Sequence, residues 1–297
     1  MADRLYGCIE AGGTKFVCAV ASAPSDVHER VSITTADPVS TLGHVVDFFR
    51  RMEGEHGAIA AFGVASFGPA DVNAASSGWG RILSTPKPGW SGIDICGAIA
   101  QAFAVPVGFD TDVNGAVLAE AEWGAAKGAS TAAYVTVGTG IGVGIAIDGK
   151  AVHGRRHPEM GHIFPRRHSD DLVFTGTCPF HGDCLEGLAS GPAIERRWAN
   201  PLSELGSEEQ EIVAFYLGQL AMTLIATLST GAIVFGGGVL NTPGLLDRIK
   251  TAATALNQSY WCADAEIGTI IRAPGLDQNS GLLGALLLAQ RANKSAP

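Results

Sequence analysis

Charged residues are scarce in this 297-residue chain: Asp, Glu, Lys and Arg make up 16% of it, whereas 46% of its residues are hydrophobic. That balance excludes an intrinsically disordered protein, which combines high net charge with few apolar residues. Basic residues are scarcer still, because 20 Lys and Arg against 29 Asp and Glu give a formal net charge of −9. A nucleic-acid partner is therefore disfavoured, since such proteins need a basic stripe to neutralise phosphates.

No export signal and no clean membrane-spanning run is visible in this sequence. Residues 1–4 are polar, and the run 5–20 is broken by Glu10, Lys15 and three glycines, which argues against a signal peptide. The uncharged stretch 212–246 contains polar residues, three consecutive glycines and Pro243, which favours a buried helix and strand over a membrane span. We expect a soluble, cytoplasmic protein with no membrane partner.

Glycine, in contrast, is in excess. The 39 glycines are about 13% of the chain, against a usual share of about 7%, and they have no G-X-Y period, so collagen is excluded. The length predicts two domains or one large domain with a deep core.

The order of apolar and helical segments predicts an α/β protein. Strands are expected at 5–9, 16–21, 59–65, 105–109, 131–137, 143–147 and 231–235, and helices at 95–104, 114–127, 208–228 and 281–294. LYGCIEAGGTKFVCAV and AYVTVGTGIGVGIAI repeat one design, a glycine turn between two strands. The repeat predicts two similar domains facing each other across a cleft, 1–115 and 116–280, with helix 281–297 packing back on the first.

The glycine turns are candidate phosphate loops. Consecutive glycines let backbone N–H groups point into a concavity without Cβ atoms in the way, and threonine hydroxyls and a lysine add donors. For one such sequence taken alone, an ordinary hairpin turn is the better explanation. Two matched turns and a third glycine turn favour a two-part nucleotide site made of Gly12, Gly13, Thr14 and Lys15; Gly138, Thr139 and Gly140; and Gly236, Gly237 and Gly238.

Asp112 lies in DTDVN, between an expected strand and an expected helix. Open α/β sheets bind ligands at the carboxyl ends of strands, so Asp112 is a candidate general base on a substrate hydroxyl. Aspartate is equally common as a helix N-cap, and Asp110 is a competing cap or base. The residues alone leave these alternatives even.

Two of the six cysteines have a histidine between them. Cys178, His181 and Cys184 lie in CPFHGDC, and with His162 they match a tetrahedral, structural zinc site. His157 and His168 are alternative fourth ligands, and a redox-active cysteine pair or a cluster of unrelated loop residues would also fit this segment. The remaining four cysteines are expected to be small core residues, and no disulfide framework is expected.

These motifs resemble the ROK family of sugar kinases, specifically its bacterial fructokinase branch. The resemblance spans nearly the whole chain and is most specific in two segments, STPKPGW at 84–90 and CPFHGDCLEGLASGP at 178–192. It also includes EAGGTK at 10–15, SFGPADV at 66–72, TDVN at 111–114, VTVGTGIGVG at 135–144, HPEMGHI at 157–163 and FGGGVLN at 235–241. It implies two actin-like, ribonuclease-H-like ATPase domains and ATP-dependent phosphorylation of a hexose hydroxyl.

Site roles follow from the resemblance, motif by motif. Asp112 resembles the catalytic base, and the three glycine turns resemble the phosphate and adenosine loops for ATP and Mg²⁺. The residues that resemble sugar contacts are Asn114, Glu159, His162 and Glu186. The Zn²⁺ ligands would be His162, Cys178, His181 and Cys184, with the zinc bracing the sugar-binding loop. The chain departs from the wider family at Glu10, where aspartate is usual, and at His181, where a third cysteine is usual.

The resemblance implies a fructokinase that forms fructose 6-phosphate, and it suggests a homodimer. Glucokinase, mannokinase and N-acetylhexosamine kinase are alternatives, because no spacing fixes the stereochemistry of the sugar. A sugar-sensing repressor is less favoured, since only four residues precede Leu5 and the net charge is −9. A bare zinc-binding interaction module would not need the paired glycine turns with Asp112.

Overall fold

The computed structural model describes residues 4–295, which form two compact units. The first unit comprises residues 4–119, 152–157 and 279–295, and the second comprises residues 120–151 and 158–278. The chain changes unit inside helix α3 (Asp112–Trp123), four residues beyond the predicted boundary, and residues 152–157 return to the first unit. Ala296 and Pro297, which the prediction assigned to the C-terminal helix, lie outside the described residues.

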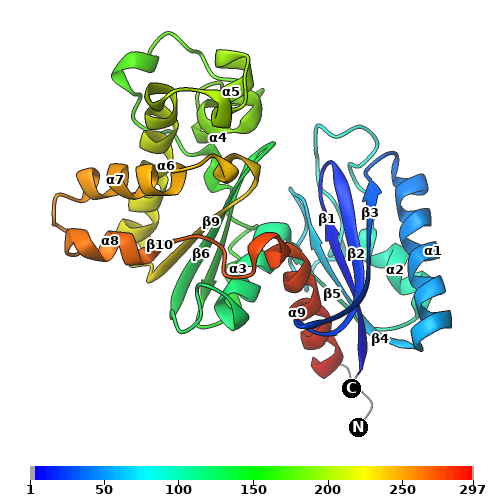
Figure 1. Ribbon diagram of the computed structural model, residues 1–297. Helices are drawn as coiled ribbons and strands as arrows, with labels where there is room; N and C mark the ends of the chain where they lie inside the picture. Colours follow the sequence, from blue (N-terminus) through cyan, green and yellow to red (C-terminus); the bar gives the residue numbers. More distant parts are fainter. Residues whose placement is uncertain (1–3, 296–297) are drawn as a thin grey trace. The chain divides into compact units, whose positions relative to one another are not determined.

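The first unit has a five-stranded mixed sheet in the order β3-β2-β1-β4-β5 (Figure 1). Strands β1 and β2 are antiparallel around the first glycine turn, whereas β1, β4 and β5 run parallel. The strands are β1 (Leu5–Ala11), β2 (Lys15–Ala23), β3 (Asp26–Thr34), β4 (Ile59–Ser66) and β5 (Val107–Thr111).

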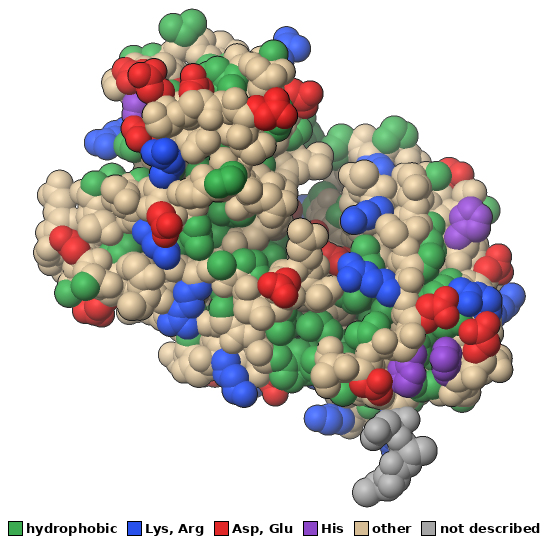
Figure 2. Space-filling model, in the orientation of Figure 1, with side chains coloured by type: hydrophobic (Ala, Val, Ile, Leu, Met, Phe, Trp, Pro, Cys, Tyr) green, Lys and Arg blue, Asp and Glu red, His purple; other side chains and the backbone are tan. Residues whose placement is uncertain are grey.

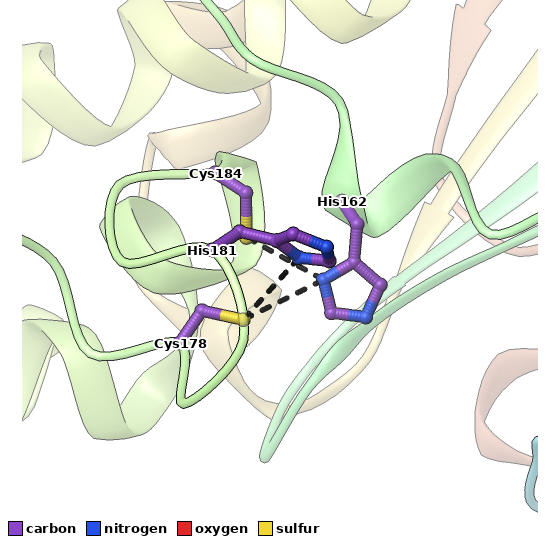
Figure 3. A group of neighbouring side chains, drawn as sticks. All are labelled: His162, Cys178, His181 and Cys184. Carbon is purple, nitrogen blue, oxygen red and sulfur yellow. Dashed lines mark hydrogen bonds between the residues drawn. The ribbon is translucent and has the colours of Figure 1, made fainter.

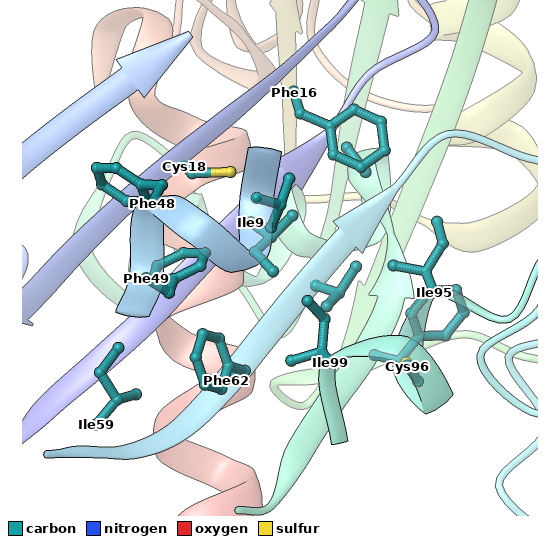
Figure 4. Packing of buried hydrophobic residues seen from close by; sticks show 14 of the residues in the cluster. Ile9, Phe16, Cys18, Phe48, Phe49, Ile59, Phe62, Ile95, Cys96 and Ile99 are labelled. Atoms are coloured by element: carbon teal, nitrogen blue, oxygen red, sulfur yellow. The ribbon is translucent and has the colours of Figure 1, made fainter. Parts of the chain in front are cut away.

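Helices cover both faces of this sheet. Helix α1 (Pro38–His56) and helix α2 (Ile95–Phe103) bury their apolar sides against one face, where the core includes Phe48, Phe62 and Ile99 (Figure 4). Asp37 caps α1 by accepting from the Ser40 N–H at 2.9 Å, and Pro38 occupies the first turn, where no N–H is needed. Helix α9 (Ser280–Ser295) packs on the opposite face (Figure 1).

Small residues let α9 approach the sheet. A Cβ added to Gly63 would lie 1.8 Å from the Ala285 carbonyl oxygen, and one added to Gly108 would lie 2.4 Å from the Leu288 carbonyl oxygen. Gly284 of α9 makes the same kind of backbone contact with Gly115 of α3. Part of the glycine excess is therefore a packing requirement of helix against sheet, and not only a property of the three glycine turns.

Replacing Gly63 with Ala is expected to destabilise the protein by roughly 3 kcal/mol, because the new methyl group meets backbone atoms that cannot rotate away. Urea unfolding followed by circular dichroism measures the change. Gly43→Ala is the matched control: it lies in α1 with open space around its Cβ position, so it should stabilise by about 0.5–1 kcal/mol. A Gly63→Ala variant as stable as the wild type would contradict this packing.

The second unit repeats the sheet design in the order β10-β9-β6-β7-β8. Strands β6 and β7 are antiparallel around the second glycine turn, and β6, β9 and β10 run parallel. The strands are β6 (Thr131–Val137), β7 (Ile141–Ile147), β8 (Lys150–Ala151), β9 (Ala232–Gly236) and β10 (Ile271–Arg272).

Helix α6 (Ser207–Leu228) forms the interior of the second unit and packs along α7. By length and composition it is the one described helix that could cross a membrane, but 56% of its apolar stretch is buried in the protein. The other helices here are α4 (Leu185–Ala189), α5 (Gly191–Trp198), α7 (Leu245–Asn257) and α8 (Asp264–Ile270). The short 3₁₀ turns of the chain are η1 (Met160–His162), η2 (Ser169–Asp171), η3 (Leu202–Glu204), η4 (Gly238–Asn241) and η5 (Asp277–Asn279).

The surface carries both signs of charge. On the face shown in Figure 2, Lys and Arg side chains are interspersed with Asp and Glu and form no single basic patch. Some opposite charges are paired: Arg51 lies 2.9 Å from Glu29 and 3.5 Å from Glu55. This face offers no basic stripe of the kind that nucleic acids require.

The predicted strands and helices are confirmed, with ends shifted by a few residues. Helix 114–127 begins earlier, at Asp112, and ends at Trp123. Strands β3, β8 and β10 and helices α1, α4, α5, α7 and α8 were not predicted. The core role is wrong for Cys262, which is partly exposed between α7 and α8, whereas Cys8, Cys18 and Cys96 are buried as expected.

Candidate functional site

Strand register places three of the sequence motifs at one edge of the first sheet. Ala11 at the end of β1 pairs with Ser66 at the end of β4, and Ser66 pairs in turn with Thr111 at the end of β5. EAGGTK, SFGPADV and TDVN each continue from these strand ends. The carboxyl edge of a parallel sheet is where α/β proteins bind ligands, so this edge is the candidate site of the first unit.

The first glycine turn is held by the end of β3. The Gly12 N–H donates to the Lys15 carbonyl at 3.0 Å, and Thr35 donates through its hydroxyl to the Gly12 carbonyl at 2.8 Å and through its N–H to the Thr14 carbonyl at 2.9 Å. Gly13, Thr14 and Lys15 are exposed. The turn therefore has a fixed base and a tip that faces solvent.

The N-cap role considered for Asp112 belongs to its neighbour. The hydroxyl of Thr111 accepts from the Asn114 N–H at 3.2 Å, which is the capping bond at the start of α3. Asp112 is the first helical residue, not the residue before the helix, and its Oδ1 accepts from the Val113 N–H at 2.8 Å. Its carboxylate lies at the sheet edge and is not needed as the cap.

Asp110, the competing base, is committed to a buried hydrogen-bond network. Its carboxylate accepts from the Thr111 N–H at 2.8 Å, from the Asn114 side-chain amide at 2.7 Å and from His153 Nε2 at 3.0 Å. Oδ1 already accepts from Thr111 and Asn114, and a proton on Oδ2 would weaken the contact with His153. Asp112 is thus the better candidate base. Asn114 is held by Asp110 and His153, and its buried Oδ1 has no hydrogen-bond partner among the described residues.

The His153–Asp110 contact predicts a pH-dependent contribution to stability. The hydrogen bond to Asp110 raises the pKa of His153, against the lowering effect of partial burial. The pair then stabilises the fold fully below the ordinary histidine pKa of about 6.5, and the contribution is lost as pH rises through the higher folded pKa. Sequence reasoning did not single out His153, because only the fold brings it to Asp110.

Wild type and His153→Gln should therefore differ most in free energy of unfolding near pH 6, and the difference should shrink as the pH is raised from about 6.5 upward. Urea unfolding at a series of pH values measures this difference. His44→Gln, at an exposed position of α1, should show no such trend. A His153 difference that grows with pH would contradict the pairing.

A cavity of about 780 Å³ lies along β5 in the first unit. Phe109 and His153 line one part of it, and Leu288 and Arg291 of α9 line another. Asp112 does not line it. His153, which contacts Asp110, lines the cavity, but the candidate base does not. The candidate reaction site is therefore the edge formed by the strand ends.

The second and third glycine turns lie together at one edge of the second sheet. Thr136 of β6 pairs with Gly236 of β9, so the turn Gly138–Gly140 and the turn Gly236–Gly238 follow adjacent parallel strands. The Gly138 N–H donates to the Gly140 carbonyl at 2.9 Å, and Thr139 is exposed. This edge is the counterpart of the candidate site in the first unit.

Packing explains why some of these positions must be glycine, whereas for others no neighbouring described atom requires it. A Cβ at Gly236 would lie 2.2 Å from the Tyr134 hydroxyl, and Gly237 has φ +91° and contacts Val137 backbone. Cβ atoms at Gly13, Gly138 and Gly238 would meet no described atom within 4 Å, and these residues have no positive φ. Open space at glycine is what a closely approaching phosphate requires.

His162, Cys178, His181 and Cys184 form one cluster in the second unit, which we call the Cys/His cluster (Figure 3). Their ligand atoms all lie within 4.8 Å of one another. His162 Nδ1 lies 3.4 Å from Cys184 Sγ and 3.7 Å from Cys178 Sγ, which is also 3.7 Å from His181 Nδ1. Tetrahedral zinc with its usual bond lengths spaces such ligands by roughly 3.3–3.8 Å, so the donor set fits zinc.

Two thiols and two imidazoles are also donor types that Zn²⁺ prefers. Burial raises the pKa of the Cys184 thiol to about 11, and the nearby Cys178 and Glu186 add to the effect. A divalent cation favours the thiolate and offsets these contributions. The alternative ligands lie elsewhere: His157 Nε2 accepts from the Ala70 N–H in the first unit, and His168 Nδ1 accepts from the Asp170 N–H at η2.

The remaining candidate residues flank these features. Glu159 directly precedes η1 and is exposed, and Glu186 lies in the first turn of α4 after Cys184. The carboxylate of Glu10 lies next to Gly281 at the start of α9. Burial raises the pKa of Glu10, while the charges of Arg30 and Lys15 lower it.

A buried network joins the 162–184 segment to the helices it packs on, and nothing in the sequence indicated it. Asp171 accepts from the Tyr216 hydroxyl at 2.6 Å and pairs with Arg197 at 3.2 Å. The Arg197 guanidinium lies 4.1 Å from the centre of the Phe174 ring. The network ties this irregular segment to α5 and α6, and no local pattern connects residues so far apart in the chain.

Comparison with known proteins identifies the class. The ROK family model matches residues 6–292, and the chain belongs to the ROK family. It is 46% identical to a fructokinase of Zymomonas mobilis over 97% of each chain, and 39% identical to a fructokinase of Streptococcus mutans over 97% of this chain and 98% of that one.

A ROK hexokinase of Thermus thermophilus aligns with a TM-score of 0.79 at 29% identity, covering 98% of this chain and 100% of that chain. A ROK glucokinase of Streptomyces griseus aligns with a TM-score of 0.73 at 23% identity, over 97% of this chain and 99% of that one. The resemblance drawn from the motifs is confirmed, and with it the predicted actin-like α/β fold.

Proposed function

We propose that this protein is a fructokinase, which transfers the γ-phosphoryl group of ATP to the 6-hydroxyl of D-fructose. The observation that carries the proposal is Asp112, a carboxylate at the carboxyl edge of a parallel sheet that is spared the capping role by Thr111. The likeness to fructokinases over nearly the whole chain supports fructose as the sugar.

In this mechanism Asp112 is the general base. Its carboxylate accepts the proton of the sugar hydroxyl while the oxygen attacks the γ-phosphorus of ATP and the bond to the β-phosphate oxygen breaks, which releases ADP. The contacts with Asp110 and His153 fix the side chain of Asn114, two residues after the base. Asn114 Oδ1, a buried acceptor, suits a hydroxyl donor.

The glycine turns bind phosphate in this proposal. Backbone N–H groups at Gly13 and Gly138 have open space in front of them, so phosphate oxygens can come close. Gly236–Gly238 contact the adenosine side, and Lys15 and Thr14 add donors to the first turn. Mg²⁺, when bound with ATP, neutralises charge on the β- and γ-phosphates.

The sugar contacts and the metal lie in the second unit. Glu159, His162 and Glu186 are proposed to bind sugar hydroxyls, and the Cys/His cluster is proposed to hold a structural Zn²⁺. Because His162 directs Nδ1 at the cysteines, its Nε2 is the atom left for a sugar hydroxyl. With four protein ligands, such a site would be structural and would have no open position for a reacting group.

We further propose a cytoplasmic homodimer. The dimer is supported by exposed apolar side chains on the segment that carries the Cys/His cluster, because such side chains mark protein–protein interfaces. They include Phe164, Val173 and Phe180, which are 68%, 94% and 72% exposed. Light scattering should give twice the chain mass of 30.6 kDa. A monomer mass at micromolar concentration would contradict it.

A coupled kinase assay tests the substrate. With ATP and Mg²⁺, kcat/KM should be highest for fructose among fructose, glucose, mannose and the N-acetyl hexosamines. A higher kcat/KM for another sugar would replace fructokinase with the corresponding kinase, and phosphorylation of none of them would contradict a hexose kinase.

A further inference from the structure

The second glycine turn, Gly138–Gly140, is held by the residues that follow the Cys/His cluster. The Gly191 N–H donates to the Gly138 carbonyl at 2.8 Å, at one end of the turn. The Ile141 N–H donates to Glu186 Oε2 at 3.0 Å, at the other end. Both contacts come from within seven residues of Cys184, a member of the cluster.

The other segment of the cluster, which carries His162, contacts Ile141, the strand residue directly after the turn. Gly161 directly precedes His162. A Cβ at Gly161 would lie 1.9 Å from the Ile141 carbonyl oxygen, so the backbone of η1 is in direct contact with Ile141. The Leu185 N–H donates to the Ile163 carbonyl at 2.8 Å and joins the two segments. Figure 3 shows the side chain of His162 pointing toward Cys178, His181 and Cys184 of the other segment.

The contact made by Glu186 is unexpected for a residue beside a phosphate loop. Its carboxylate lies so near Gly140 that a Cβ there would be 2.6 Å from Oε2. A negative charge at this position repels phosphate, so electrostatics alone would disfavour it. What the carboxylate supplies is an acceptor that fixes the Ile141 N–H, directly after the turn whose tip, Thr139, is exposed.

We propose that Glu186 is a positioning residue for the Gly138–Gly140 turn, and that the Cys/His cluster fixes this turn through Glu186, Gly191 and Gly161. Metal loading of the cluster then sets the affinity for nucleotide, in addition to any effect on sugar. The inference rests on the proposed function only in taking the turn as a phosphate loop. Glu186 Oε1 stays available for a sugar hydroxyl.

The first test measures the turn itself and needs no substrate. Hydrogen–deuterium exchange of peptides covering residues 138–145 should be several-fold faster in Glu186→Ala than in the wild type, because the Ile141 N–H loses its acceptor. Glu186→Gln keeps an acceptor oxygen and should exchange at the wild-type rate. Glu195→Ala, an exposed glutamate of α5, is the matched control. Unchanged exchange in Glu186→Ala would overturn the positioning role, whatever sugar the enzyme uses.

The second test measures ADP binding by calorimetry without sugar. Glu186→Ala should bind ADP about ten-fold more weakly, and Glu186→Gln should bind it as tightly as the wild type or more tightly, since the repulsive charge is gone. Loss of ADP affinity in both variants, or loss of fructose affinity alone, would overturn the inference. Wild type that binds ADP but phosphorylates no hexose would instead contradict the proposed function.

The third test addresses the metal. Wild type treated with a chelator, at a temperature where circular dichroism shows it still folded, should exchange faster in residues 138–145 and bind ADP several-fold more weakly. Re-addition of zinc should restore both values. If the metal-depleted, folded protein keeps wild-type exchange and ADP affinity, the cluster does not position the turn.

Discussion

Replacing Asp112 with Asn should lower kcat for sugar phosphorylation by roughly 10²–10⁴-fold, the usual contribution of a positioned general base. The amide keeps the shape of the side chain and its Oδ1 contact with the Val113 N–H, but it cannot accept the proton of the sugar hydroxyl. Because the Thr111 hydroxyl caps α3, the helix should survive, and the KM values for sugar and ATP should change little. Steady-state kinetics with a coupled assay measures all three quantities.

Two control variants make the Asp112 result specific. Asp47→Asn, at an exposed position of α1, should leave kcat unchanged. Asp110→Asn should lower stability, because it weakens the contacts with His153 and Asn114. An Asp112→Asn enzyme with near-wild-type kcat would remove Asp112 from the base role.

Replacing Cys184 with Ser should abolish stoichiometric metal and lower the free energy of unfolding by at least about 3 kcal/mol. Cys184 is fully buried, precedes α4 and shares the cluster with a histidine from another segment, so its loss releases two parts of the chain. In a protein of this size each kcal/mol lowers Tm by roughly 2–4 °C, so a fall of about 10 °C is expected. Metal analysis and calorimetry on the purified protein measure both effects.

Cys262→Ser is the matched control, since this partly exposed thiol lies outside the cluster. It should retain the metal and the wild-type Tm. Freshly purified, folded wild-type protein without stoichiometric zinc would contradict the structural metal, and so would a Cys184→Ser variant of unchanged stability.

Much of the fold could be predicted from the sequence because its strands have clear local signals. Short apolar runs on both sides of a glycine turn indicated β1, β2, β6 and β7, and the buried character of helix α6 was evident from polar and glycine residues in its flanks. Strand β3 was missed because it carries many charged residues and lies at the sheet edge, where one side faces water. Helix α1 mixes charges and aromatics and gives only a weak local signal.

Part of the candidate site could also be predicted from local sequence, and part depends on contacts that only the fold makes. The Cys/His cluster could be predicted because three of its ligands lie within seven residues, and only the fourth required a choice among His157, His162 and His168. The choice between Asp110 and Asp112 could not be made from the residues, since it depends on His153, about 40 residues away in sequence. The contact between Glu186 and Ile141 likewise exists only once the fold brings α4 to β7.

ATP-dependent transfer to the 6-hydroxyl of fructose, with Asp112 as base, is tested most directly by phosphorus NMR of the protein incubated with fructose, ATP and Mg²⁺. For the wild type we expect a phosphate ester on C6 with one equivalent of ADP, and for Asp112→Asn no ester on the same timescale. An ester on another carbon, ADP with no ester, or equal product from both proteins would contradict this mechanism.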